Sequence, residues 1–370
     1  MEDNKNFETL NYKLYLLDRD FKNSKNIVKY IEESQRFYNG DQYPNANYKN
    51  MIRITMNLCS FSSKLKAAKI VGTQRYITFT SDTDVDCTAL QRFDEYNISK
   101  LNEKYEDFHS ALNGENNGTE IVYYRWDEDD TTYKGIYKGG LALEHVDPLQ
   151  FAAANSYIQD VQNQKWVMFW KDEDISAVRE MVDCKDKEKA KKIKENIFPD
   201  DMVETNVERQ YVNHGLVTVF TRFFRIDGEV YYMCSTRTTD LFEYPHAINP
   251  YVNKNIDKHM KDIVENWKKG VAEERGYDSY DKVEDYEIDW EDCINQLPKP
   301  SPINEEEYEK IKEKFSLYPF AVFRPSKTNG LFYGKSELKE LIPIQKGVNY
   351  ALSMMVKCIE NNAYNKIFAK

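Results

Sequence analysis

The segment that decides the fold is LFYGKSELKELIPIQKGVNYALSMMVKCIENN, residues 331–362. An aromatic run leads into Gly334, and Ser336 stands two residues later, where a helix would begin. Serine caps helices because its side-chain oxygen accepts a hydrogen bond from a first-turn amide. We therefore predict a structural turn with Gly334 at positive φ, a cap at Ser336, and a long helix that ends near Asn362.

The helix predicted over residues 336–362 has two different faces. Its apolar residues recur at intervals of three, four and seven, as in an amphipathic helix. This stripe contains Leu338, Leu341, Gln345, Val348, Leu352, Met355 and Ile359, and the other side carries Lys346, Tyr350, Ser353 and Lys357. Pro343 should kink the helix or mark a new start. Two arrangements fit this pattern: packing on its own domain, or packing against copies of itself around a ring with the polar side facing a lumen.

The same turn resembles a phosphate-binding loop, in which Gly-Lys-Ser opens a helix and loop amides hold phosphate. Here Gly330 lies four residues before Gly334, whereas the motif needs five, and Asn329 holds the position of the first glycine. Bulky residues fill the interval where the backbone would have to wrap tightly. A nucleotide-binding enzyme therefore stays only as an alternative, and we predict no catalytic activity.

Other motifs that would carry chemistry are incomplete. Asp82, Asp84 and Asp86 alternate as at the start of a calcium loop, but Cys87 and Phe93 occupy the places of its glycine and glutamate. The five histidines are scattered and the six cysteines are widely spaced, without the spacing of metal ligands. We therefore predict no catalytic site, no metal site and no cofactor.

Composition sets wider bounds on the protein. The chain has 370 residues, of which 41% are hydrophobic, so it can bury a sizeable core. Its net charge of -11 argues against tight binding of duplex DNA, although a channel that lets DNA slide past is compatible with it. The sequence contains no run of about 18 apolar residues, so it predicts no membrane span.

Local patterns predict alternating helical and β regions. Residues 1–25 are mostly polar and predict an arm. Asp227-Gly228 gives the strongest hairpin signal, between strands over 217–226 and 229–236. In the helix predicted over 50–71, the apolar stripe includes Phe61 and Leu65. The other predicted helices cover 26–38, 85–113 (closed by Asn113-Gly114), 175–197, 254–269 and 305–315; the other strands cover 75–80, 119–126, 141–146, 165–170 and 319–324; an acidic, proline-rich loop covers about 270–303.

Several stretches, taken in order, resemble portal proteins of tailed double-stranded DNA bacteriophages, particularly phages that infect Firmicutes. Their order and spacing along nearly the whole chain carry the resemblance. They are YNGDQY (38–43), the helix over 56–71, FHSALN (108–113), GTEIVY (118–123), VDPLQF (146–151), KWVM (165–168), LFYGKSEL (331–338) and IPIQKGVNY (342–350).

The resemblance implies an α+β fold with a portal wing-like domain over 26–330, followed by a Gly turn and stem helix over 331–370. It implies a non-enzymatic ring, usually of twelve subunits, at the head vertex of the virion. The ring would assemble in the host cytoplasm, and a membrane would not be among its partners. Partners would be the terminase large subunit, a head–tail connector or adaptor, scaffold or capsid proteins, and double-stranded DNA passing through the channel. Lys346, Tyr350, Ser353 and Lys357 would then face the channel or a subunit seam.

Family members usually continue into a clip, a second stem helix, a tunnel loop and a crown, whereas this sequence ends at Lys370. We therefore expect those parts to be absent from this chain. Another phage head or tail structural protein with a wing-like fold is the main alternative.

Overall fold

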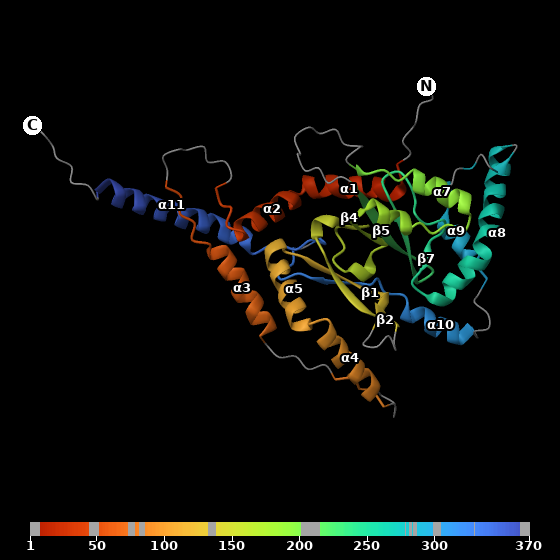
Figure 1. Ribbon diagram of the computed structural model, residues 1–370, viewed down its shortest axis with the longest axis horizontal. Helices are drawn as coiled ribbons and strands as arrows, with labels where there is room; N and C mark the ends of the chain where they lie inside the picture. Colours follow the sequence, from red (N-terminus) through yellow and green to blue (C-terminus); the bar gives the residue numbers. More distant parts are fainter. Residues whose placement is uncertain are drawn as a thin grey trace, which may run out of the picture. The chain divides into compact units, whose positions relative to one another are not determined.

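The computed structural model describes residues 8–43, 52–72, 78–80, 86–131, 138–200, 215–277, 279–280, 283, 287–298, 305–328 and 330–362. Helices and antiparallel sheets alternate along the chain, in agreement with the predicted α+β class (Figure 1). Unit 1 contains residues 1–21 and 150–318, and unit 2 contains residues 22–149 and 319–370. Unit 2 thus includes residues on both sides of the boundary predicted at residue 330.

Unit 1 is built on a five-stranded antiparallel sheet with the order β3-β4-β5-β6-β7. Asp227 and Gly228 join β5 to β6 with φ values of 46° and 81°. Positive φ at both turn residues matches the right-handed twist of the paired strands, which confirms the predicted hairpin. The strands are β3 (Phe151–Ala153), β4 (Trp166–Asp174), β5 (Leu216–Ile226), β6 (Glu229–Ser235) and β7 (His246–Ala247).

The predicted N-terminal arm over residues 1–25 is wrong, because helix α1 (Leu10–Ser24) occupies most of it. Tyr12 is buried against the sheet of unit 1, with its ring centroid 5.9 Å from that of Phe220. Tyr15 packs on Trp170 at 5.0 Å. Two aromatic residues one helical turn apart therefore anchor a segment whose polar composition had predicted an arm.

The helices of unit 1 follow their capping residues. Asp174 and Asp186 each accept hydrogen bonds from first-turn amides, so the helix predicted over 175–197 is two helices, α6 (Ile175–Glu180) and α7 (Lys187–Glu195). Helix α8 (Pro250–Arg275) is longer than predicted and packs an apolar face on the sheet. Two shorter helices, α9 (Trp290–Asn295) and α10 (Glu305–Lys314), and the 3-10 turn η3 (Val161–Asn163) complete the described elements.

Unit 2 combines a three-stranded antiparallel sheet, of order β2-β1-β8, with helices. The elements are α2 (Ile27–Tyr38), α3 (Leu58–Val71), α4 (Thr88–Lys100), α5 (Glu103–Asn117), β1 (Glu120–Thr131), β2 (Lys138–Val146), η2 (Pro148–Gln150), β8 (Phe320–Phe323) and α11 (Leu338–Asn362). Helices α3 and α5 pack side by side, and the C-terminal half of α11 projects past them (Figure 1). The predictions of α2, α10 and β8 are confirmed.

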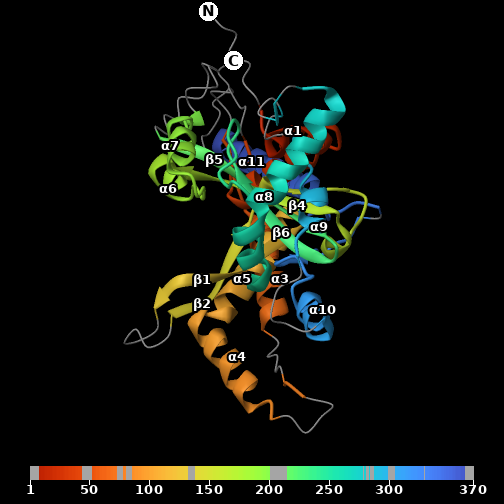
Figure 2. The same cartoon turned by 90° about the vertical axis from the view of Figure 1, so that its right-hand side faces the viewer.

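The helix predicted over 85–113 is two helices, α4 and α5, which meet at a bend (Figure 2). Asn102 adopts a left-handed conformation with a φ of 50°, which interrupts the helix. Helix α5 then continues past Asn113-Gly114 and ends at Gly118, whose φ is 78°. A glycine in this conformation commonly ends a helix because it has no Cβ to clash.

Helix α3 begins at Leu58 rather than near residue 50, and the predicted apolar stripe is wrong. Its buried residues are small: Cys59, Ser63 and Ala67. Phe61 is 65% exposed. Small side chains on the inner face let α5 approach closely, so packing distance rather than hydropathy sets the orientation of α3. Of the strand predicted over 75–80, residues 75–77 lie outside the described residues and 78–80 are not a strand.

A buried carboxylate ties three parts of unit 1 together. Glu229 is 4% exposed and accepts hydrogen bonds from Asn249 Nδ2 at 2.8 Å and from the Tyr308 hydroxyl at 3.2 Å. These bonds link the β5–β6 hairpin to the start of α8 and to α10. Lys312 adds an ion pair with Asp227 in the hairpin turn at 2.5 Å. Burial of an ionisable side chain requires such partners, so this network fixes α10.

We expect Tyr308→Phe to destabilise unit 1 by about 1–2 kcal/mol, because the buried carboxylate loses one donor. Urea denaturation followed by tryptophan fluorescence measures this change. Tyr251→Phe is the matched control, since Tyr251 is 44% exposed and lies outside the network. Equal midpoints for the two variants would show that the Tyr308 bond contributes no net stability.

Candidate functional site

The junction between β8 and α11 is built around a close backbone contact between Gly118 and Gly334. A Cβ atom on Gly118 would lie 2.5 Å from the Ser336 amide nitrogen, and one on Gly334 would collide with the Gly118 carbonyl oxygen. Gly334 does not have a positive φ; in this loop Gly330 does, at 69°. The predicted reason for the glycine is therefore wrong: Gly334 is needed for close approach of two backbones.

Hydrogen bonds hold the turn on the end of α5. The Gly334 amide donates to Thr119 Oγ1 at 2.8 Å, and the Lys335 amide donates to the Ser326 carbonyl at 3.0 Å. Ser336 Oγ accepts from the Leu338 amide at 3.1 Å, as a capping residue does, and donates to the Glu115 carbonyl at 2.9 Å.

These bonds bear directly on the phosphate-loop alternative. A phosphate cradle needs loop amides without other acceptors, whereas the amides of Gly334, Lys335 and Leu338 already donate to protein oxygens. The Lys335 ammonium pairs with Glu340 at 2.6 Å. The geometry of this turn therefore disfavours nucleotide binding through it.

From Gln345 onward, the inner face of α11 is polar. Gln345 is 1% exposed, and its Oε1 accepts from the amides of Leu58 and Cys59 at 2.9 and 3.3 Å. Its Nε2 donates to the Met56 carbonyl at 2.6 Å. One side chain thus satisfies three backbone groups at the start of α3, where a helix otherwise leaves amides unpaired.

The same arrangement continues one and two turns further along α11. Asn349 accepts from the Met56 amide at 3.3 Å and donates to Gln42, and Ser353 Oγ accepts from the Ile54 amide at 3.1 Å. Both side chains are buried, at 2% and 5% exposure. We call Gln345, Asn349 and Ser353 the polar ladder. Its four-residue spacing lets one helix face hold the extended residues 54–57 by their backbone.

The ladder changes the predicted faces of α11. Its buried residues are Leu338, Ile342, Gln345, Asn349 and Ser353. At 100° per residue, their mean direction lies roughly 70° from that of the predicted stripe. Ile344, Met355 and Ile359 are more than half exposed, at 61%, 60% and 65%. The helix therefore buries amides and presents much of its apolar side outward.

The predicted channel or seam face is divided by this packing. Ser353 belongs to the buried ladder. Lys346 pairs with Glu33 of α2 at 2.9 Å, which neutralises part of its charge. Tyr350 is 60% exposed and Lys357 is half-buried, so these two side chains still share an outward face.

A titratable cluster that the scattered histidines did not predict lies between α5 and the β1–β2 ribbon. His145 Nδ1 is 2.5 Å from Glu120 Oε1, and its Nε2 is 2.7 Å from Glu106 Oε2. The hydrogen bond with Glu120 raises the pKa of His145 to about 8. Burial raises the pKa of Glu120, which is 1% exposed, and nearby Asp147 adds to this effect. An imidazolium between two carboxylates therefore holds α5 on β1 and β2.

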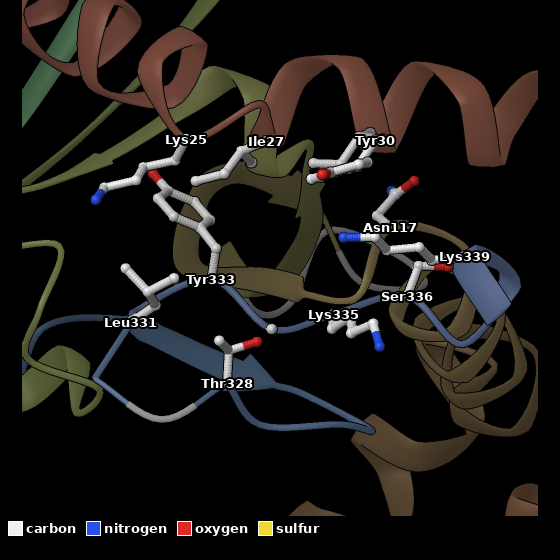
Figure 3. Close-up of a pocket in the computed structure, with 12 residues that line it drawn as sticks. Lys25, Ile27, Tyr30, Asn117, Thr328, Leu331, Tyr333, Lys335, Ser336 and Lys339 are labelled. Atoms are coloured by element: carbon white, nitrogen blue, oxygen red, sulfur yellow. The ribbon is translucent and has the colours of Figure 1, made fainter.

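Within the described part of the chain, no three His, Cys, Asp or Glu residues are grouped as metal ligands. In the same residues, no helix combines the length and apolarity needed to cross a bilayer. Beside the turn lies a pocket of about 250 Å³, lined by the start of α2, the turn and the first turn of α11 (Figure 3).

We expect Gly334→Ala to destabilise unit 2 by about 1–3 kcal/mol, because the new methyl group overpacks the contact with Gly118. Gly347→Ala is the control of opposite sign: nothing lies within 4 Å of its added Cβ. Alanine in a helix interior should stabilise α11 by up to about 1 kcal/mol. Thermal melts compare the two; destabilisation of similar size in both would mean that the backbone contact is not the cause.

We expect Asn349→Leu to cost about 1–3 kcal/mol, because the Met56 amide and the Gln42 side chain lose their buried partner. Met355→Leu should change stability by less than about 0.5 kcal/mol, since Met355 faces outward. Urea midpoints measure both. A higher urea midpoint for Asn349→Leu than for the native chain would show that the ladder does not stabilise the packing of α11.

The His145 cluster predicts a pH dependence with a definite sign. Because the folded pKa exceeds the ordinary value of 6.5, the cluster contributes stability below about pH 6.5 and loses it as pH rises through about 8. The maximum contribution is about 2 kcal/mol, from 1.36 kcal/mol for each pKa unit. Urea midpoints between these pH values should fall for the native chain and stay flatter for His145→Gln. Parallel curves would rule out this linkage.

No protein-family model matches the chain, and comparison with curated proteins gives no match.

Proposed function

We propose that this chain is a structural subunit of the portal ring of a tailed bacteriophage, located at the head vertex, where it surrounds the path of double-stranded DNA. The proposal rests first on the order of the stretches that resemble portal proteins. In the described residues, YNGDQY follows α2, GTEIVY begins β1, and LFYGKSEL forms the turn into α11.

One observation carries the proposal further: part of the apolar side of α11, mostly in its C-terminal half, is exposed. Ile344, Met355 and Ile359 are exposed, while the polar ladder fixes a different face of the helix, roughly 110° away at 100° per residue. A helix that is held by hydrogen bonds and presents apolar side chains outward suits packing against neighbouring copies. Terminase, a connector or adaptor, and capsid or scaffold proteins would be further partners of such a ring.

Fewer residues than predicted remain as candidates for a face toward DNA. Lys346 has a carboxylate partner and Ser353 is buried. Tyr350 and Lys357 are the remaining candidates for a channel or seam. Weak contacts of this kind agree with a net charge of -11, because tight phosphate binding would hinder the passage of DNA.

Light scattering and negative-stain images of the purified chain test the proposal. We expect concentration-dependent association with ring-shaped particles, and loss of association in the double variant Met355→Glu, Ile359→Glu. Phe198→Glu is the control, because Phe198 is an exposed aromatic residue of unit 1, 56% accessible. A chain that stays monomeric, or rings that survive the double variant, would contradict the role given to α11.

A further inference from the structure

The pocket beside the turn combines an apolar lining with positive charge. Its twelve lining residues include Lys25, Lys335 and Lys339 and no aspartate or glutamate, although acidic residues outnumber basic ones in the chain, 62 to 51. All of the lining belongs to unit 2. Figure 3 shows Tyr333 rising from the turn and Tyr30 on the facing helix. The composition is complementary to an apolar group that carries a negative charge.

Lys339 is the cation that defines this complementarity. Its ammonium lies 3.5 Å from the centre of the Tyr30 ring, and no carboxylate pairs with it among the described residues. Lys335 differs, because Glu340 holds its ammonium. Asn117 lies on the same wall; its Oδ1 accepts from Gln35 at 3.1 Å, so its amide group can donate to an incoming oxygen. An ammonium and an amide therefore provide two donors for one carboxylate.

The size of the pocket limits its occupant. A volume of about 250 Å³ is below the roughly 300–1,000 Å³ of pockets that hold drug-sized ligands. One large side chain fits such a space. An α-carboxylate lies on the same residue as that side chain, whereas an acidic side chain would require a second residue in the pocket.

We propose that this pocket binds the C-terminal residue of a partner peptide, with its α-carboxylate at Lys339 and Asn117 and a large apolar side chain against Ile27, Leu331 and Tyr333. Capture of a C-terminal carboxylate is an established mode of peptide recognition, in which backbone amides usually hold the carboxylate. Here the side chains of Lys339 and Asn117 would take that part, because the amides of Gly334, Lys335 and Leu338 already have acceptors. The inference does not depend on the portal proposal, since it uses only the lining of unit 2.

N-acetyl-phenylalanine and N-acetyl-phenylalanine amide are the probes, titrated into the full chain by calorimetry and NMR. We expect the acid to bind at least about tenfold more tightly than the amide, a difference of about 1.4 kcal/mol. Lys339→Gln should remove this preference and Lys339→Arg should keep it. Lys69→Gln, a change to an exposed lysine of α3, should leave it unaltered.

Three results would overturn the proposal. Equal binding of the acid and the amide would remove the role of the carboxylate. Failure of the acid to bind up to its solubility limit would remove the site itself. Binding of inorganic phosphate as tight as that of the acid would indicate a simple anion site without recognition of the apolar side chain. Melting curves of both Lys339 variants check that each is folded, so loss of binding is not a consequence of unfolding.

Discussion

The contact between Gly118 and Gly334 is the constraint on which unit 2 depends. It brings the residue that follows α5, just before β1, into direct backbone contact with the turn that enters α11. Neither position has room for a Cβ atom, so the two chain segments approach more closely than side chains allow. The hydrogen bonds of Thr119 and Ser336 then fix the angle at which α11 leaves the turn.

Helix α11 is held in place by hydrogen bonds of its polar ladder and by apolar contacts near the turn. The polar ladder supplies hydrogen-bond partners for backbone groups of residues 54–59. Leu338 and Ile342 pack near the turn beside Phe37 and Cys59. Buried amides and hydroxyls are expensive unless paired, and here each finds a backbone partner. Position is thus encoded by hydrogen bonding, which leaves the apolar side chains available for contacts outside the unit.

Local sequence patterns predicted the elements whose structure has local causes. Asp227-Gly228 defined its hairpin because both residues tolerate positive φ, and α2, α10 and β8 follow from hydrophobic pattern and flanking breakers. The turn at Gly334 and the cap at Ser336 were also visible in the sequence.

The remaining features arise from tertiary contacts that hydropathy does not reveal. The inner face of α3 is small rather than apolar, and α1 packs through Tyr12 and Tyr15 despite its polar composition. In α11, Gln345, Asn349 and Ser353 repeat every four residues, so the polar periodicity of the sequence carries the signal for the ladder. His145 needed its partners from α5 and β1, which are distant in sequence.

The polar ladder has a consequence for how this helix can evolve. Each rung recognises main-chain atoms, which every residue type except proline supplies, so the sequence of residues 54–56 can drift while the rungs themselves cannot. Selection on α11 would therefore preserve its amides and hydroxyl and permit exchange among its outward aliphatic residues. In distant relatives the buried polar positions of this helix, rather than its apolar ones, would mark common ancestry.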